Sequence, residues 1–189
     1  LGWWRGEDDL VAEVGPDLTG SVAFDDAVVG RGLALDSTSS VLVDGFPTVS
    51  SAVSVETWVK LADSGVVQAL LTRWDFPSTD DSVRAYALMV EPLGVISWQT
   101  DETSSRRPAE LRAVAPQIFD GQFHHVAATW DNSGMALFLD GVEIASQASQ
   151  GGTLNPTPTT QLRLGSKAGI GVPYFLSGVL DEPSIWARA

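Results

Sequence analysis

The sequence predicts an all-β protein, a two-sheet antiparallel β-sandwich of about a dozen strands. Three observations lead to this fold class. Short runs of β-branched, aromatic and other apolar residues recur throughout the 189 residues. Clusters of Gly, Pro, Asn, Asp and Ser separate these runs at short intervals, as turns do. No window of about ten residues shows the 3.6-residue period of an amphipathic helix.

The middle of the chain predicts an antiparallel meander with tight turns. Residues 123–130 and 135–139 have the composition of half-buried strands. Between them, residues 131–134 read D-N-S-G, which is typical of a turn. Asp140-Gly141 then predicts a type I′ hairpin turn, because both central residues of such a turn need positive φ. Residues 142–145 form the returning strand.

Other strands are expected on both sides of this meander. Residues 53–61 alternate best, with Val53 and Val55 on one side and Glu56 and Trp58 on the other. Further strands are predicted at residues 22–24, 33–35, 41–43, 66–73, 86–90, 95–98, 111–114, 161–164 and 176–186. The Gly-, Pro- and Thr-rich residues 149–160 are expected to form a loop.

Four segments of the chain resemble one known family, in order and spacing. Residues 123–141 read F-H-H-V-A-A-T-W-D-N-S-G-M-A-L-F-L-D-G, residues 32–36 read G-L-A-L-D and residues 53–60 read V-S-V-E-T-W-V-K. Residues 177–182 read S-G-V-L-D-E and residues 185–189 read I-W-A-R-A. Together they resemble the laminin-G-like jelly rolls of the concanavalin A-like lectin/glucanase superfamily. The resemblance spans nearly the whole chain and implies this fold, which hosts lectins, adhesins, spacers and hydrolases.

The resemblance also implies where most of the seven tryptophans lie. The family's core positions correspond to Trp58, Trp130 and Trp186. We expect Trp3 or Trp4 to join them, and Trp98 to be a core residue as well.

The composition excludes several classes of partner. The net charge is −13, with 24 acidic residues against 11 basic ones, so a nucleic-acid backbone is not an expected partner. No stretch is apolar for the ~20 residues that a spanning helix needs, so membrane insertion is not expected. The absence of cysteine excludes disulfides and thiolate metal sites.

The start and end of the chain suggest its context. The sequence opens on Leu1 and stops where the family signature stops. We therefore expect residues 1–189 to be a single domain excised from a larger multidomain protein, with the other domains of the parent chain among its partners.

Catalysis is not expected from the residues. The glucanase branch of the superfamily uses E-x-D-x-E or E-x-D-x-x-E on one strand, and neither triplet occurs here. Asp181 and Glu182 are adjacent, so in a strand their side chains point to opposite faces. The same argument prevents His124 and His125 from chelating one metal ion. We expect one of these histidines to be packed and hydrogen-bonded and the other to lie on the opposite face.

The resemblance further implies a structural calcium ion. Residues 180–186, L-D-E-P-S-I-W, are similar to a strand of glucanase relatives in which the Asp ligates Ca²⁺. Asp181 is the matching position, and Glu7 and Asp36 are the carboxylates expected to join it. Ca²⁺ takes six to eight oxygen ligands, so backbone carbonyls would complete the shell. The alternative is that Asp181 caps a turn through hydrogen bonds.

Two other acidic stretches carry open alternatives. Asp75, Asp80 and Asp81 share one loop, which is either a second metal site or a solvated surface. Residues 5–13 keep three acidic residues of the family's N-terminal loop but have V-A-E where relatives have Asn-Asp. That departure weakens any ligand role that depends on the missing Asp.

One group of aromatic and basic residues is the candidate ligand site. Trp74 lies at a strand-to-loop boundary beside Phe76. Sugars stack on aromatic rings while polar side chains fix their hydroxyl groups. We predict a ligand patch made of Trp74, Phe76, Arg106, Arg107 and Tyr174. The alternative is that Trp74 merely covers the edge of the sandwich.

These observations favour a non-catalytic binding or adhesion module of a secreted or cell-surface protein, of bacterial origin. Its ligand would be a glycan or an extracellular protein, and calcium would be structural. A ligand-free spacer domain in a long surface protein is the alternative. A divergent hydrolase is a third interpretation, which requires two carboxylates about 5 to 10 Å apart in a groove.

Overall fold

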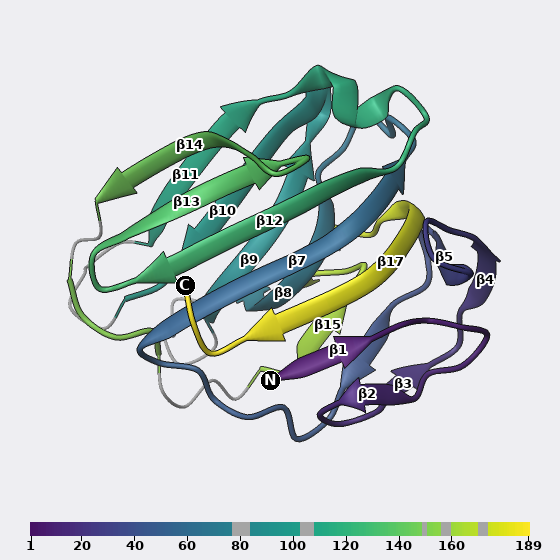
Figure 1. Ribbon diagram of the computed structural model, residues 1–189, viewed down its shortest axis with the longest axis horizontal. Coiled ribbons are helices and arrows are strands. Elements are labelled where there is room, and N and C mark those ends of the chain that lie inside the picture. Colours follow the sequence, from purple (N-terminus) through teal and green to yellow (C-terminus); the bar gives the residue numbers. More distant parts are fainter. Residues whose placement is uncertain (77–83, 103–107, 149–150, 156–159, 170–173) are drawn as a thin grey trace.

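The structure is a computed structural model that describes residues 1–76, 84–102, 108–148, 151–155, 160–169 and 174–189. Residues 76, 168 and 169 are placed by their backbone alone. Among the described residues the regular structure is almost entirely β, in two sheets of nine and eight strands. The predicted two-sheet β-sandwich is therefore confirmed (Figure 1).

The nine-stranded sheet has the order β14-β13-β12-β7-β17-β1-β2, and β5 and β4 extend it beside one end of β17. Its strands are β1 (Gly2–Trp4), β2 (Ala12–Val14), β4 (Ala23–Asp26), β5 (Arg31–Asp36), β7 (Ala52–Leu61), β12 (His124–Asp131), β13 (Gly134–Leu139), β14 (Val142–Ala148) and β17 (Ser177–Trp186). Figure 1 shows β17 lying between β7 on one side and the N-terminal strands on the other.

The eight-stranded sheet has the order β11-β10-β9-β8-β15-β6-β3, and β16 pairs in parallel with β8. Its strands are β3 (Leu18–Gly20), β6 (Val41–Val43), β8 (Gln68–Phe76), β9 (Arg84–Glu91), β10 (Val95–Thr100), β11 (Ala109–Val114), β15 (Leu162–Leu164) and β16 (Ala168–Gly169). Two short 3-10 turns, η2 (Pro92–Gly94) and η3 (Pro116–Phe119), connect strands at one end.

The core lies between the two sheets, and strand alternation fills it. In β7, Val53, Val55, Thr57 and Val59 are buried, while the residues between them are half-buried on the outer face. Such alternation is expected for a sheet with one face in the core and one toward solvent. The largest fully buried side chains include Trp4, Trp98 and Trp130, as predicted.

Trp58 and Trp186 do not lie in the core, so that part of the prediction is wrong. Both are only half-buried. Trp58 alternates with Thr57 and Val59, so it points away from the core. Trp186 pairs with Ser54, which is another outward position of β7. The period of the strand, rather than the position in the family signature, decides which face a residue occupies.

The histidine pair is arranged as predicted. His124 is buried and its ring contacts two carboxylates, with Nδ1 2.9 Å from Asp140 Oδ2 and Nε2 3.2 Å from Asp120 Oδ1. His125 lies on the outer face of the sheet against Trp58. Asp140 and Gly141 both have positive φ, of 51° and 78°, which confirms the predicted hairpin turn.

The contacts of His124 with Asp140 and Asp120 predict a contribution to the free energy of unfolding that depends on pH. Burial opposes charge on the ring, but the hydrogen bonds to Asp140 and Asp120 outweigh it and raise the pKa of His124. A histidine whose pKa is higher in the folded protein than in the unfolded chain stabilises the fold. This stabilisation is complete below the unfolded pKa of about 6.5 and is lost as pH rises through the folded pKa.

We therefore expect His124→Gln to lower the free energy of unfolding by about 1–2 kcal/mol at pH 5.5 and by clearly less at pH 9. Urea unfolding at both pH values measures the difference. An equal loss of free energy of unfolding at both pH values would show that the contribution of His124 does not depend on its positive charge.

Candidate functional site

A pocket of about 580 Å³ lies on the outer face of the eight-stranded sheet. Its floor belongs to a small cluster that is separate from the main core and consists of Ala69, Trp74, Ala87 and Met89. On β9, Ala87 and Met89 alternate with Tyr86, Leu88 and Val90, which belong to the core. The pocket is lined by Val67, Trp74, Arg84, Met89, Glu91, Gln99, Pro108, Glu110, Arg112, Lys167 and Tyr174.

Trp74 is the central aromatic residue of this pocket. It lies near the end of β8, where the register with β9 shifts. The small side chains of Ala69 and Ala87 leave room for its indole, and Tyr174 packs against the same cluster. Trp74 is only 3% exposed, and within the described part of the chain its indole Nε1 has no hydrogen-bond partner. A buried donor without a partner costs about 1–3 kcal/mol.

Lys167 brings a positive charge into the same pocket. It follows β15, and its backbone N–H donates to the Tyr174 carbonyl over 3.3 Å, which holds the two residues together. Its Nζ lies 4.8 Å from the Trp74 ring centroid and 5.9 Å from that of Tyr174. The same Nζ is 3.4 Å from Gln99 Oε1, and the side chain is almost completely buried. Burial lowers the pKa of Lys167 to about 8, despite the attraction of Glu110.

Two arginines and their carboxylate partners complete the polar lining. Arg84 Nε is 2.8 Å from Asp101 Oδ2, and Arg84 Cζ lies 5.9 Å from the Trp74 ring centroid. Burial raises the pKa of Asp101, although Arg84 opposes that shift. Arg112 is paired with Glu91. The site thus combines aromatic rings with fixed charged groups, an arrangement that suits a polar ligand.

The two carboxylates that line the pocket are each engaged by another lining residue. Glu91 lies opposite Val95 of β10, and Glu110 lies opposite Gln99. Their backbones are therefore offset by about 13 Å along the strands, with β10 between them. Glu91 is bound to Arg112, and Gln99 Nε2 donates to Glu110 over 2.9 Å.

The structure brings together two of the five predicted ligand residues. Trp74 and Tyr174 line one pocket, although Trp74 is buried rather than exposed beside it. Arg106, Arg107 and the side chain of Phe76 lie outside the described residues. Most of the polar lining was not predicted from the sequence, namely Lys167, Arg84, Gln99, Glu110 and Arg112. Polar residues at alternating positions of β10 and β11 are the signal that would have indicated Gln99, Glu110 and Arg112.

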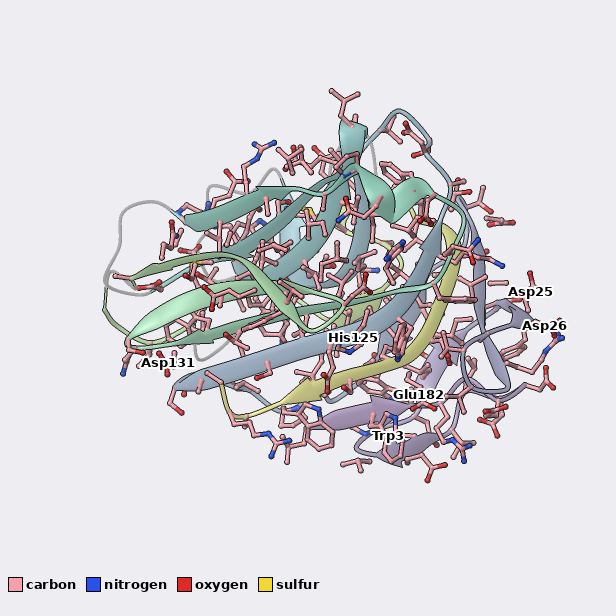
Figure 2. All side chains as sticks on the ribbon, turned by 45° about the horizontal axis from the view of Figure 1, so that its top comes forward. Trp3, Asp25, Asp26, His125, Asp131 and Glu182 are labelled. Atoms are coloured by element: carbon pink, nitrogen blue, oxygen red, sulfur yellow. The ribbon has the colours of Figure 1, made fainter. Side chains whose placement is uncertain are left out.

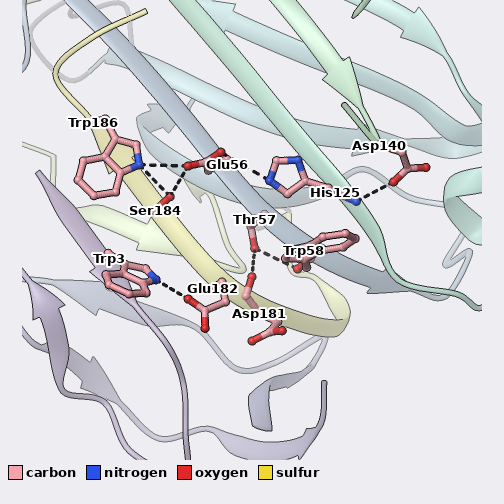
Figure 3. Close-up of polar contacts among 10 residues, drawn as sticks. All are labelled: Trp3, Glu56, Thr57, Trp58, His125, Asp140, Asp181, Glu182, Ser184 and Trp186. Carbon is pink, nitrogen blue, oxygen red and sulfur yellow. Dashed lines mark hydrogen bonds and ion pairs between the residues drawn. The ribbon is translucent and has the colours of Figure 1, made fainter. Parts of the chain in front are cut away.

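Asp181 occupies a different place, inside β17 at a register shift against β7. It is fully buried, and its Oδ2 accepts hydrogen bonds from the backbone of Val28 and Val29, both over 3.0 Å. Its backbone carbonyl accepts a hydrogen bond from Thr57 Oγ1 (Figure 3). Burial raises the pKa of Asp181. Asp181 therefore caps the turn that precedes β5, and its Oδ1 has no partner among the described residues.

The two other predicted calcium ligands have different positions. Glu7 reaches the same turn, where its Oε2 accepts the Arg31 N–H over 3.1 Å. Asp36 pairs with Ser177, four residues along β17 from Asp181. Its Oδ1 accepts hydrogen bonds from Ser39 and Thr38, and these lower the pKa of Asp36 to about 2.

A calcium ion fits this region in one respect. The orphaned buried Oδ1 of Asp181 is a hard oxygen donor of the kind that Ca²⁺ prefers. Within the described residues, no three acidic or histidine side chains converge on one metal position. A bound ion would therefore take most of its ligands from backbone carbonyls. Of the second acidic cluster, Asp75 contacts Thr160 Oγ1 over 3.2 Å, and Asp80 and Asp81 lie outside the described residues.

The outer face of the nine-stranded sheet carries a second polar and aromatic cluster (Figures 2 and 3). Glu56 Oε1 accepts hydrogen bonds from Ser184 Oγ over 3.0 Å and Trp186 Nε1 over 3.1 Å. Its Oε2 lies 3.5 Å from His125 Nε2, and that contact is the main cause that lowers the pKa of Glu56 to about 2. Trp3 donates to Glu182 on the same face. The polar groups of this network satisfy one another.

Comparison with known proteins decides the family. The family model Laminin_G_3, described as the concanavalin A-like lectin/glucanases superfamily, matches residues 35–189. The chain belongs to this superfamily. The laminin-G-like resemblance seen in the sequence is thereby confirmed. A curated relative, the human Adhesion G protein-coupled receptor D2, is 34% identical over 139 residues. That match covers 62% of this chain but only 14% of the receptor's length.

Solved structures of this superfamily fold share low sequence identity with the chain. One solved structure is Domain 4 of AbnA, a GH43 extracellular arabinanase from Geobacillus stearothermophilus, in complex with arabinotriose. It has a TM-score of 0.64 at 18% identity, and the match covers 97% of this chain and 90% of the AbnA domain. The CBM40 of Ruminococcus gnavus IT-sialidase bound to α2,3-sialyllactose has a TM-score of 0.64 at 15% identity, covering 91% of each. A botulinum neurotoxin type C structure has a TM-score of 0.69 at 8% identity. The match covers 100% of this chain and 47% of the neurotoxin chain. At these identities the similarity shows the shared fold.

The burial of Lys167 predicts a stability effect that depends on pH. Its folded pKa of about 8 lies below the unfolded value, so the charged form destabilises the fold. This penalty is fully present below pH 8 and is relieved as pH rises toward the unfolded pKa of about 10.4.

Lys167→Met keeps the apolar stem and removes the charge. We expect it to raise the free energy of unfolding by about 2–3 kcal/mol at pH 7 and by much less at pH 10. Guanidinium unfolding at the two pH values measures the gain. A Lys167→Met variant with a lower free energy of unfolding than the wild type at pH 7 would show that the charge of Lys167 does not destabilise the fold.

Proposed function

We propose that this chain is a non-catalytic carbohydrate-binding module of an extracellular or cell-surface protein. One observation carries the proposal: the pocket on the outer face of the eight-stranded sheet combines the Trp74 and Tyr174 rings with buried and half-buried polar groups. Aromatic rings bind the C–H faces of sugars, and polar side chains around them select the hydroxyl groups. No helix in the described residues is long and apolar enough to cross a membrane.

The comparisons support a binding role. The AbnA domain is in complex with arabinotriose and the CBM40 is bound to sialyllactose. Cell entry of the botulinum neurotoxin type C depends upon interaction with two ganglioside molecules. These are ligands of the named proteins. They differ from one another, so they do not identify the sugar that this chain would bind. A protein ligand and a ligand-free spacer are the competing outcomes of the test below.

The test compares sugar binding by variants on the two opposite sheets. A glycan array selects a ligand, and isothermal titration then measures its affinity for the wild type, Tyr174→Ala, Trp74→Phe and Trp186→Ala. We expect Tyr174→Ala to weaken binding about tenfold by removing a stacking surface, and Trp74→Phe to weaken it by a similar factor by removing the indole N–H.

Trp186→Ala is the matched control, because it removes an aromatic ring from the outer face of the other sheet. Its affinity should equal that of the wild type. Loss of binding in Trp186→Ala with no effect in Tyr174→Ala would move the site to the nine-stranded sheet. Absence of binding to any glycan would favour the protein-ligand or spacer interpretation.

We also propose that a structural calcium ion binds beside Asp181. Its support is the buried Asp181 Oδ1, together with Glu7 at the same turn. An ion that binds only the folded state stabilises it by about 2.7 kcal/mol at one hundred times its Kd.

Thermal unfolding with calcium or with a chelator tests this proposal. We expect calcium to raise the Tm of the wild type by about 5–10 °C, given this stabilisation and a chain of this size. Asp181→Asn should abolish the rise, whereas Asp36→Asn should keep it because the Asp36 carboxylate is engaged in its own turn. An identical Tm with calcium and with chelator in the wild type would leave Asp181 a turn cap alone.

A further inference from the structure

We infer that this pocket is a groove for a neutral oligosaccharide. The Trp74 end of the groove stacks one sugar unit, and a second subsite at the Glu91–Arg112 ion pair binds the hydroxyl groups of a unit further along the same chain. The inference rests on the proposed carbohydrate-binding function and narrows it from any sugar to an uncharged chain. Three features of the pocket support it: its length, the exposure of the ion pair and its balanced charge.

The pocket extends along β9. Arg84 at one end of this strand and Glu91 at the other end both line the pocket. Glu91 is seven residues after Arg84 in an extended strand, so their backbones lie about 23 Å apart. The volume of about 580 Å³ is within the range of pockets that bury drug-sized ligands, which are larger than a single hexose. The space is therefore sufficient for more than one sugar unit.

The two ends of the pocket differ in their chemistry. Trp74 lies opposite Arg84 in the register of β8 and β9, and its ring centroid is 5.9 Å from Arg84 Cζ. At the other end, Glu91 of β9 and Arg112 of β11 form an ion pair across β10. Both ends line one pocket, so the space between them is continuous. A sugar unit stacked at the Trp74 end therefore leaves the ion pair to contact a later unit of the chain.

The ion pair is accessible to a ligand. The side chain of Arg112 is 49% exposed and that of Glu91 is 17% exposed. A guanidinium group has five N–H donors and a carboxylate has about four lone-pair sites, so their mutual contact leaves donors and acceptors for other groups. A sugar hydroxyl both donates and accepts hydrogen bonds, as a serine hydroxyl does. Adjacent hydroxyl groups of one sugar unit therefore match the guanidinium and the carboxylate together.

The charges around the pocket balance. Three cations and three anions surround it, namely Arg84, Arg112 and Lys167 against Glu91, Glu110 and Asp101, which is the ion-pair partner of Arg84. The ion pairs and the attraction described above match each cation with one of these anions. An anionic sugar would meet three carboxylates without a surplus of positive charge, and like charges in close contact are costly. Uncharged hydroxyl groups are the better match.

The experiment measures affinity as a function of chain length. Titration calorimetry uses arabinose, xylose and glucose oligomers, each from monosaccharide to tetrasaccharide, and galacturonic acid oligomers of the same lengths as acidic probes. If the glycan array selects another sugar, the oligomers of that sugar are added.

The proteins are the wild type, Arg112→Ala, Tyr174→Ala and Arg5→Ala. Arg5→Ala is the matched control, because Arg5 is an arginine of similar exposure, 43%, that contacts Glu7 and Glu182 beside the nine-stranded sheet. Exposed ion pairs add little to stability, so Arg112→Ala should fold. Circular dichroism checks the fold of each variant.

We expect the wild type to bind a neutral tetrasaccharide about tenfold or more tightly than the disaccharide of the same series, because the second subsite adds hydrogen bonds. Arg112→Ala should weaken tetrasaccharide binding about tenfold and leave disaccharide binding unchanged. Tyr174→Ala should weaken the binding of both, and Arg5→Ala should weaken neither. A loss of affinity that depends on chain length separates a subsite from a general effect on the fold.

Three results would overturn the inference and leave the proposed carbohydrate binding in place. Equal affinity for disaccharide and tetrasaccharide would show that the site holds no more than the shorter sugar. Tetrasaccharide binding that is unchanged in folded Arg112→Ala, or weakened equally for both lengths, would contradict a second subsite at Arg112. A preference for galacturonic acid oligomers would show that the ligand is charged. No binding of any probe, combined with an empty glycan array, would overturn both the inference and the proposed function.

Discussion

The pairing of the last strand with the beginning of the chain is the constraint on which the rest of the structure depends. Residues 177–180 of β17 pair with β5, and residues 184 and 185 pair with β1, while β7 follows β17 along its other edge. Without β17, the N-terminal strands would have no partner connecting them to β7 and the meander beyond it. At the shift between the two halves, Asp181 binds the turn before β5 with its carboxylate and Thr57 with its carbonyl. Such long-range pairing makes folding slow, because the chain must close on itself before the sheet is complete.

Closure of the sandwich leaves the outer face of the eight-stranded sheet available for function, and this face is only partly solvated. Trp74 and Met89 form a second small apolar layer there, over alanines that present almost no side chain. This layer removes water from the surroundings of Lys167, which lowers its pKa and makes its charge costly to the fold. Groups that destabilise a structure while lining a pocket are characteristic of binding sites. The opposite face, around Glu56, satisfies its own polar groups and offers no comparable unpartnered donor among the described residues.

The sequence predicted the fold well because its signals are local. Asp140-Gly141 specified its turn, and the alternation of β7 placed Val53 and Trp58 on opposite faces. The family signature then misled the assignment of Trp58 and Trp186 to the core, since a signature marks positions along the chain but not the face to which a strand turns them. Lys167 could not be found in this way. It is a single lysine after a turn, and its burial arises from contacts with strands about 70 to 100 residues earlier.

A sugar ligand bound beside Trp74 would change the surroundings of one indole group. The most direct measurement is a ¹H–¹⁵N spectrum of the seven tryptophan indole groups during titration with the sugar that binds best, with Trp74→Phe assigning the Trp74 signal. We expect the Trp74 indole signal to shift downfield and to saturate with the binding isotherm, because its unpartnered N–H gains an acceptor. Signals of Trp3, Trp58 and Trp186, on the opposite sheet, should remain in place. Shifts confined to those three signals, with the Trp74 signal unchanged, would contradict binding beside Trp74 and would place the ligand on the nine-stranded sheet.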